Sequence, residues 1–225
     1  MHVWLFDIDG TLIRAGGAGG AALAAALTSE FGVEHPDDAV ELAGRTDRAI
    51  TVDSLRRNGI EPSEENLARF FDAYLRHLPV HLAARNGFVL PGVRELLDAL
   101  ALRDDVVVGL LTGNFRRAAE LKLGHFALAD YFRLGGYGDH HLDRDDVARD
   151  AVAEIHRLEG LVHDQVQVWV VGDTPYDVRC GRAIGARVIA VGNGFGSRED
   201  LTAAGPDHLL EDLSDSARLL GLIAG

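Results

Sequence analysis

The feature that most constrains this chain is a pair of aspartates directly after a short apolar segment near its start. Residues 3–6 are Val-Trp-Leu-Phe, and Asp7 and Asp9 follow, with Gly10 and Thr11 behind them. A short apolar run that ends in this way is typical of a buried strand. Because side chains alternate along a strand, we expect Asp7 and Asp9 to project to the same side. Two acids at the carboxyl edge of a parallel sheet disfavour stability and indicate a site for chemistry.

Composition narrows the class of protein. The chain has 225 residues, and 22 Lys+Arg against 35 Asp+Glu give a net charge of -13, which opposes binding to nucleic acid or an anionic membrane. Cys180 is the single cysteine, so we expect no internal disulfide and a reducing compartment. No secretory segment or apolar stretch of membrane-spanning length is visible. We therefore expect a cytoplasmic globular protein; the oligomeric state is not predicted.

A helical insertion follows the first strand. Glycines are frequent between Gly16 and Gly20, which suits a hinge. The segment from Ser63 to Leu78 carries apolar residues at helical spacing, and we expect Pro79 to disturb that helix near its end. Residues 13–86 thus read as helical, without a convincing strand.

From Gly87 onward, strands and helices alternate. The expected strands are residues 106–111, 131–134, 166–171 and 188–191, and the expected helices are residues 93–100, 115–121, 144–158 and 177–184. This alternation predicts an α/β fold with a Rossmann-like, doubly wound parallel sheet. We therefore expect a core of residues 1–12 and 87–225, interrupted by a helical cap of residues 13–86.

A polar turn follows the strand expected at residues 106–111. Thr112, Gly113 and Asn114 offer hydrogen-bond donors near a helix N-terminus, where phosphate oxygens bind readily, although such a turn is common in itself. Lys122 comes soon after and is the one lysine in a chain with 21 arginines. An ammonium serves as a compact charge for a phosphoryl group, so this exception indicates a requirement, while the alternative is a surface lysine.

Two more aspartates follow the strand expected at residues 166–171. Asp173 and Asp177 are separated by a tight turn, an arrangement able to hold a divalent cation that prefers oxygen ligands. The alternative is that Asp177 is simply the N-cap of the next helix. That alternative explains Asp173 less well.

Together these stretches resemble the four motifs of the haloacid dehalogenase superfamily, in the same order and strand context. The motifs are Asp7-x-Asp9-Gly10-Thr11, Thr112-Gly113-Asn114, Lys122 and Gly172-Asp173-x-x-x-Asp177. The resemblance extends from Val3 to about Gly196. It is to the phosphatase branch with an inserted helical cap, which includes phosphoglycolate phosphatases and beta-phosphoglucomutases.

The resemblance implies a Mg²⁺ cofactor and an aspartate nucleophile. In members of this superfamily, the residue matching Asp7 attacks phosphorus to form an aspartyl-phosphate. The residue matching Asp9 protonates the leaving oxygen and then activates water. The metal would be held by Asp7, the backbone carbonyl of Asp9 and Asp173, with Asp177 acting directly or through water.

The resemblance also assigns the residues that neutralise and orient the phosphoryl group. These are Thr112, Gly113, Asn114 and Lys122. Members that displace halide have no use for a general acid at the position of Asp9. The resemblance therefore implies phosphoryl chemistry on a small phosphorylated metabolite.

The insertion matches the position of the family's cap, which closes over the site and contacts the rest of the substrate. Gly44-Arg45-Thr46-Asp47 resembles its specificity loop, so Arg45 and Thr46 are candidate substrate contacts. The alternative is a helix start with Thr46 or Asp47 as N-cap and a solvated Arg45.

Two other features are assigned structural roles. Adjacent His140 and His141 are interpreted as a solvated loop before a helix with Asp143 as its N-cap, rather than as a second metal site. Cys180 is interpreted as a small packed residue.

The leading hypothesis is a Mg²⁺-dependent phosphatase acting on a small phosphomonoester, such as phosphoglycolate, a sugar phosphate or a nucleotide. The enzymatic alternative is a sugar phosphomutase, which returns the phosphoryl group to its substrate. The alternative from another class is a noncatalytic protein that binds phosphorylated metabolites.

Overall fold

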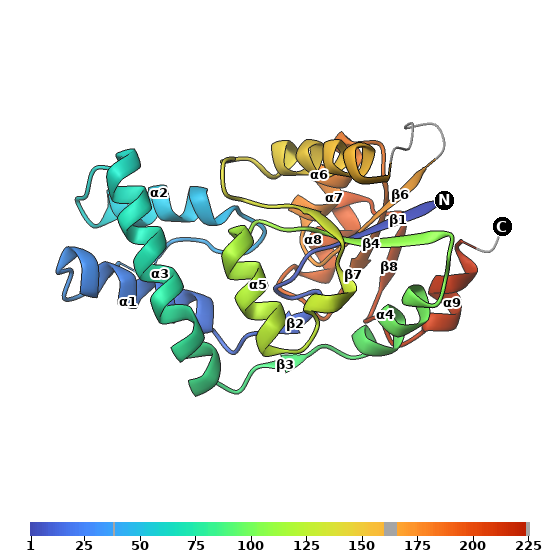
Figure 1. The fold of residues 1–225 in the computed structure, drawn as a ribbon, viewed down its shortest axis with the longest axis horizontal. Coiled ribbons are helices and arrows are strands. Elements are labelled where there is room, and N and C mark those ends of the chain that lie inside the picture. The colour runs from blue at the N-terminus through green and yellow to red at the C-terminus, as the bar shows by residue number, and fades with distance from the viewer. Residues whose placement is uncertain (38, 160–165, 224–225) are drawn as a thin grey trace.

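The computed structural model describes residues 1–37, 39–159 and 166–223. Within these residues, six strands form one sheet: β1 (His2–Phe6), β4 (Val106–Leu111), β5 (Leu134–Gly136), β6 (Gln167–Gly172), β7 (Arg187–Val191) and β8 (His208–Leu210). Their order is β5-β4-β1-β6-β7-β8, and neighbours run parallel (Figure 1). The predicted parallel α/β sheet is confirmed.

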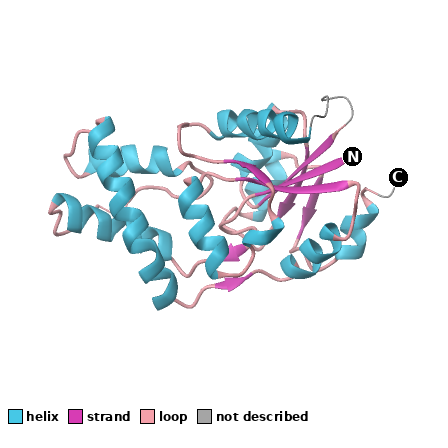
Figure 2. Ribbon diagram, in the orientation of Figure 1, coloured by secondary structure: helices cyan, strands magenta, loops and turns pink. Residues whose placement is uncertain are grey.

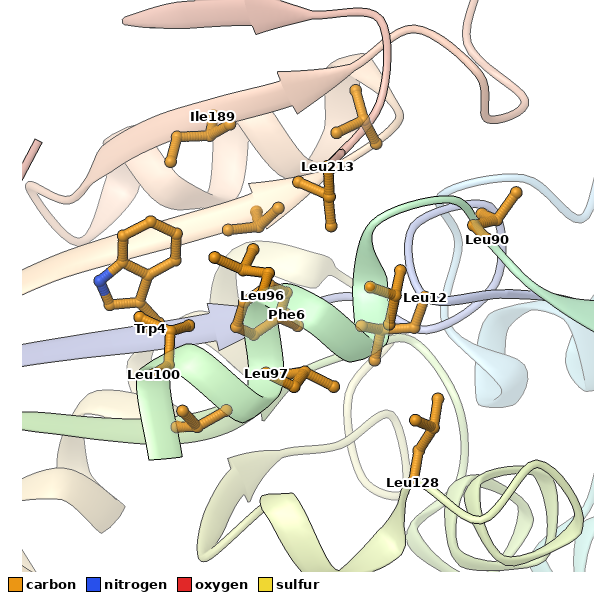
Figure 3. Close-up of a cluster of buried hydrophobic side chains, with 14 of the residues drawn as sticks. Trp4, Phe6, Leu12, Leu90, Leu96, Leu97, Leu100, Leu128, Ile189 and Leu213 are labelled. Atoms are coloured by element: carbon orange, nitrogen blue, oxygen red, sulfur yellow. The ribbon is translucent and has the colours of Figure 1, made fainter. Parts of the chain in front are cut away.

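Helices cover both faces of this sheet. They are α4 (Val93–Ala101), α5 (Arg116–His125), α6 (Arg144–Glu159), α7 (Pro175–Ala183), α8 (Arg198–Ala204) and α9 (Ser216–Gly221). Trp4 and Phe6 of β1 pack in a cluster with residues of α4, α5 and α9, part of which Figure 3 shows. Val3 and Leu5 pack in a second cluster with α6, α7 and α8. The alternation of side chains along β1 therefore supplies both cores, as a doubly wound sheet requires.

The register of the three central strands aligns their carboxyl ends. Phe6 lies opposite Leu110 of β4 and Val171 of β6. The backbone N–H of Asp7 donates to the carbonyl of Val171 at 2.9 Å. The polar residues after β1, β4 and β6 are thus brought to one edge of the sheet, where open α/β folds build their sites.

Three helices form a group beside the sheet, at the left of Figures 1 and 2: α1 (Ala18–Phe31), α2 (Asp47–Arg57) and α3 (Glu64–Ala84). Their buried side chains form a third cluster that includes Phe115 and Ala118 from the start of α5. The helices of the insertion therefore have a core of their own that also contacts α5.

The connection between this group and the sheet contains two short strands. β2 (Ile13–Arg14) pairs antiparallel with β3 (Phe88–Val89). The prediction that residues 13–86 lack a strand was wrong at this point. Two residues are too few to show a side-chain period, so the pattern had no signal there.

Helix ends follow the predicted capping residues. The hydroxyl of Thr46 accepts from the backbone of Ala49, and that of Ser63 accepts from Asn66. The helix after Ser63 runs past Pro79 to Ala84, so the proline does not end it. Burial of Leu82 beyond the proline continues the apolar stripe, and packing offsets the lost backbone hydrogen bond.

The strand expected at residues 131–134 was also misplaced. Ala129–Tyr131 is a short 3-10 helix, and β5 begins only at Leu134, where it pairs with Gly109 of β4. The start of β5 is set by where β4 offers backbone groups to pair with, and the sequence of one segment does not show this. Among the described residues, no helix combines the length and apolar character needed to cross a membrane.

Candidate active site

A cavity of about 530 Å³ lies where the carboxyl edge of the sheet faces the helical group. Asp7, Asp9 and Lys122 line it from the core. Residues of the insertion, among them Arg45 and Tyr74, line it from the other side. The structure therefore brings six predicted site residues to one cavity: Asp7, Asp9, Arg45, Gly113, Asn114 and Lys122.

Three buried carboxylates meet at the floor of this site. One ligand oxygen from each of Asp7, Asp173 and Asp177 lies within 4.8 Å of the others. Burial raises the pKa of Asp7 to about 7, with further contributions from the negative charges of Asp177 and Asp9, although Arg144 acts in the opposite direction. Burial and the charges of Asp177 and Asp7 raise the pKa of Asp173 well above its usual value. Burial therefore disfavours the ionised forms of Asp7 and Asp173.

Asp173 is held by the loops on either side of it. It accepts hydrogen bonds from the hydroxyl of Thr11 at 3.0 Å and from the backbone of Phe195 at 2.6 Å. A Cβ at Gly10, whose φ is +91°, or at Gly194 would collide with this carboxylate. These two glycines are therefore required by the close approach of backbone to Asp173.

Asp177 occupies the third position of α7 and is not its N-cap, so that alternative was wrong. Thr174 is the N-cap, and Oδ2 of Asp177 accepts from its hydroxyl at 2.8 Å and from the backbone of Thr174 and Asp173 at 3.0 and 3.2 Å. Oδ1 accepts from Nη2 of Arg144 at 2.5 Å. Both oxygens of Asp177 are thus engaged, which favours contact with a metal through water.

Arg144 was not singled out by the sequence. It is 3% exposed, and its Nη1 lies 3.4 Å from Oδ1 of Asp7 while its Nη2 contacts Asp177 and the carbonyl of Leu111. As the first residue of α6, it opposes the helix dipole, which is unfavourable without a nearby anion. The sequence signal that could have identified Arg144 was therefore a cation at the start of a predicted helix.

A second group of polar side chains lies around Lys122. Its Nζ is 2.5 Å from Oδ2 of Asp9 and 2.6 Å from Oδ1 of Asn114. The amide of Asn114 donates to Asp9 at 2.9 Å and to the hydroxyl of Thr112 at 2.9 Å. The predicted residues Thr112, Asn114, Lys122 and Asp9 thus form one connected network, and Lys122 is buried rather than a surface residue.

Asp47 is a second residue that the sequence reading did not assign to the site. Its Oδ2 accepts from the backbone of Phe115 at 2.8 Å, and its backbone N–H donates to the carbonyl of Gly113 at 2.7 Å. Burial raises its pKa to about 6, although Lys122 acts in the opposite direction. Burial by itself lowers the pKa of Lys122, but Asp9 and Asp47 outweigh it and the pKa lies above its usual value. The sequence placed Asp47 in the candidate specificity loop and as a possible N-cap, but an acid in the first turn of a helix is common, so nothing marked it as a site residue.

The loop before α2 fits tightly against the core. A Cβ at Gly113 would collide with the carbonyl of Arg45. The glycine of the predicted phosphate-binding turn therefore lies where that turn touches the loop before α2. Arg45 lines the cavity, and its Nη2 is 2.6 Å from Asp53. Thr46 is buried as the N-cap of α2, with its hydroxyl 3.4 Å from the carbonyl of Leu142, and does not line the cavity. The N-cap interpretation of Thr46 is confirmed.

The residues assigned structural roles are found in such roles. Nε2 of His141 contacts Asp150 at 2.7 Å, and the carboxylate of Asp143 accepts from the backbone of Asp145 at the start of α6. Cys180 is fully buried, and burial raises its pKa to about 12. Among the described residues, Asp7, Asp173 and Asp177 are the one group of acids, histidines and cysteines arranged closely enough for a metal.

The donor set at the floor of the cavity fits a hard divalent cation. Carboxylate oxygens are the ligands that Mg²⁺ prefers. Burial disfavours the ionised forms of Asp7 and Asp173, and the positive charge of a divalent cation would stabilise those forms. These residues could therefore hold Mg²⁺.

The chain is similar to known proteins over most of its length. A family model described as haloacid dehalogenase-like hydrolase matches residues 4–182. The chain is 33% identical to a phosphoglycolate phosphatase of Synechococcus elongatus over 96% of this chain and 95% of the relative. It is 31% identical to a phosphoglycolate phosphatase of Chromobacterium violaceum over 88% of both.

Solved structures share the fold. The structure of CbbY from Rhodobacter sphaeroides in complex with phosphate aligns with a TM-score of 0.75 at 21% identity, over 95% of both chains. A predicted phosphoglycolate phosphatase from Haemophilus somnus aligns with a TM-score of 0.72 at 17% identity, over 97% of both chains. With the family model matching well over half of its residues, the chain belongs to the haloacid dehalogenase-like hydrolase family.

Proposed function

We propose that the protein is a Mg²⁺-dependent phosphatase that hydrolyses a small phosphomonoester through an aspartyl-phosphate on Asp7. The observation that carries the proposal is the different surroundings of the first two aspartates. Asp7 is buried against Asp173, Asp177 and Arg144, whereas Asp9 contacts Lys122 and is 30% exposed in its side chain. One carboxylate is thus placed for attack and the other for proton transfer.

The reaction uses these two residues in sequence. An oxygen of Asp7 forms a bond to phosphorus while the bond from phosphorus to the leaving oxygen breaks, and Asp9 gives its proton to that oxygen. Asp9 then takes a proton from water, whose oxygen attacks phosphorus and releases phosphate and Asp7. Oδ2 of Asp9 accepts from Lys122 and Asn114, so Oδ1 is the oxygen placed to carry the proton.

The other residues hold charge in place. Mg²⁺, when bound to Asp7, the carbonyl of Asp9 and Asp173, supplies positive charge for the developing negative charge on the phosphoryl oxygens. Lys122 and Asn114 neutralise and orient the phosphoryl group, with Thr112 and Gly113 shaping the turn. Asp177 positions Arg144, and because both of its oxygens are engaged it would contact the metal through water.

The chain divides by role in this proposal. Residues 1–12 and 87–225 form the catalytic core, and residues 13–86 form a cap that excludes water and contacts the alcohol part of the substrate. Arg45 and Thr46 belong to the loop that seats the cap against the core. Paired β2 and β3 form the connection between the two parts.

Phosphoglycolate is the first candidate substrate, ahead of sugar phosphates and nucleotides. The two relatives at 31% and 33% identity carry the name phosphoglycolate phosphatase. We place the reaction in the cytoplasm, where such small phosphorylated metabolites occur and where a single buried thiol is compatible with the reducing conditions.

A panel of phosphorylated metabolites tests the proposal. Free phosphate is measured with Mg²⁺ and with EDTA, for the wild type and for Asp7→Asn. The proposal expects release of phosphate that needs both Mg²⁺ and Asp7. Isomerised substrate without free phosphate would instead identify a phosphomutase, and binding without turnover of any ester would identify a noncatalytic protein.

A further inference from the structure

Arg14 lies on the hinge strand β2 and lines the same cavity as Asp7 and Asp9. The sequence assigned it no role. Its Nη2 donates to the backbone carbonyls of Asn193 and Gly194 at 2.6 and 2.7 Å. Its guanidinium carbon lies 4.7 Å from the centroid of the Phe195 ring. The head group is thus fixed in position by two carbonyls and an aromatic face.

The loop that holds Arg14 also touches the reaction centre. The backbone N–H of Phe195 donates to Asp173 at 2.6 Å. A Cβ added at Gly10 would lie 2.7 Å from the Phe195 ring, and one added at Gly194 would collide with Asp173. The guanidinium of Arg14 therefore lies beside the loops that carry the proposed nucleophile and metal ligand.

The other cations that line the cavity are paired with acids. Arg45 pairs with Asp53 at 2.6 Å, Lys122 with Asp9 at 2.5 Å, and Arg144 with Asp177 at 2.5 Å.

Arg14 makes no ion pair within the described part of the chain. Its hydrogen bonds to the described residues come from Nη2, and they go to neutral carbonyls. Among the described residues, Nε and Nη1 therefore keep their donors, and no acid forms an ion pair with the guanidinium. A fixed planar guanidinium with free donors is suited to a carboxylate or phosphate.

We propose that Arg14 binds a second anionic group on the alcohol part of the substrate, and so selects phosphomonoesters that carry a carboxylate or a second phosphate. The inference rests on the proposed phosphatase function and adds a specificity-determining residue to it. The phosphoryl group itself is held elsewhere, by Lys122 and Asn114.

A pair of substrates tests the role of Arg14. Phosphoglycolate carries the carboxylate, and hydroxyethyl phosphate has an alcohol in its place. Arg14→Gln should lower kcat/KM for phosphoglycolate by about 10- to 100-fold, mainly through KM, because one charge-assisted contact is lost. The same variant should change kcat/KM for hydroxyethyl phosphate by less than about 3-fold, and Arg14→Lys should restore part of the loss.

Arg85→Gln is the matched control. Arg85 is exposed, does not line the cavity, and donates from Nη1 to the carbonyl of Gly16 at 3.1 Å near the same hinge. Loss of an arginine from the hinge alone should therefore leave the preference between the two esters unchanged. An Arg14→Gln enzyme that loses both activities equally would show a structural role for Arg14 and overturn the inference.

A binding measurement keeps this inference separate from the phosphatase proposal. In the Asp7→Asn background, calorimetry with Mg²⁺ should give tighter binding of phosphoglycolate than of hydroxyethyl phosphate, and Arg14→Gln should remove the difference. If Asp7→Asn binds the two esters with equal affinity both with and without Arg14→Gln, the role of Arg14 is overturned even where the enzyme is active. Propanediol bisphosphate is a third ligand, with a second phosphate in place of the carboxylate. Whichever of propanediol bisphosphate and phosphoglycolate loses more affinity on Arg14→Gln carries the anionic group that Arg14 prefers.

Discussion

The acids of the site divide into two groups that differ in how their charge is balanced. Around Asp173, three buried carboxylates share one buried arginine, Arg144. Around Lys122, the ammonium contacts Asp9 and Asn114, with Asp47 nearby, and its pKa is raised by Asp9 and Asp47 against the effect of burial. The first group has three acids for one cation, while the second has two acids for one.

This difference indicates what each group needs from outside the chain. Burying ionised carboxylates without enough positive charge is costly, so the first group is completed by a bound proton or by a cation from outside the chain. The second group already holds Lys122 beside its acids. Metal removal should therefore disturb the surroundings of Asp7 and leave those of Lys122 unchanged.

The largest effect should come from Asp7→Asn. An amide is a poor nucleophile, so kcat should fall by at least about 10⁴-fold. Steady-state phosphate release with Mg²⁺ measures this, and circular dichroism checks that the variant is folded. A variant with wild-type kcat would contradict the proposed covalent mechanism.

Asp173→Asn should have opposite effects on activity and on stability. Loss of a metal ligand should lower kcat/KM by about 10²- to 10³-fold. In EDTA at pH 8 the same change should raise Tm by about 2–4 °C, since folding no longer buries a carboxyl that is ionised in the unfolded chain. An asparagine can still accept from Phe195 and can donate to Thr11, so both hydrogen bonds survive.

Thermal unfolding with and without Mg²⁺ separates the two groups further. Mg²⁺ should raise Tm of the wild type and have little effect on Asp173→Asn. A lower Tm for metal-free Asp173→Asn than for metal-free wild type would show that the carboxylate is stabilising as it stands. That result would remove the argument for a missing cation.

The fold followed from local sequence patterns where these were long enough. The apolar run of β4 at residues 106–111 was located to the residue, because a strand buried on both faces has a continuous apolar sequence. β2 and β5 were missed or misplaced since both are short and depend on a partner strand. Pro79 does not end α3 because packing, which local propensity does not include, decides that helix.

The candidate site was predictable in its residue types and less so in its contacts. The positions of Asp7, Asp9, Lys122 and Asp173 followed from strand ends and motif spacing. Arg144 and Asp47 were missed because their importance comes from burial against residues distant in the chain. A pattern in one sequence shows the periodicity along a helix or strand, but it does not show which distant residues contact each other.

Lys122→Met tests the second group. It leaves Asp9 and Asp47 without their cation, so it should lower kcat by about 10²-fold and the free energy of unfolding by about 3–5 kcal/mol. Its Mg²⁺-induced shift in Tm should equal that of the wild type, because Asp173 and its neighbours are unchanged. Loss of that shift would show that the two groups are coupled.

The pH dependence of stability should differ with and without metal. Burial, together with the charges of Asp177 and Asp9, raises the pKa of Asp7 from 3.8 to about 7. The folded state then holds a proton that the unfolded chain has released, so stability falls as pH rises from about 4 to about 7. The loss should be on the order of 3 kcal/mol in EDTA.

Urea unfolding at pH 5 and pH 8 measures this pH effect. Saturating Mg²⁺ should reduce it, since the cation replaces the proton at the cluster. Asp7→Asn should flatten the metal-free curve. A metal-free wild type that becomes more stable from pH 5 to pH 8 would contradict the assigned charge balance.

The smallest effect should come from Asp47→Asn, which removes a charge and keeps the shape. The amide oxygen can still accept from the backbone of Phe115, and the backbone bond to Gly113 is unaffected. We expect kcat/KM to change by less than about 10-fold and the free energy of unfolding by less than about 1 kcal/mol. Asp47→Ala, which leaves the buried N–H of Phe115 without an acceptor, should cost about 1–3 kcal/mol. Equal losses in the two variants would mean that the charge of Asp47, rather than its hydrogen bond, joins the loop before α2 to the core.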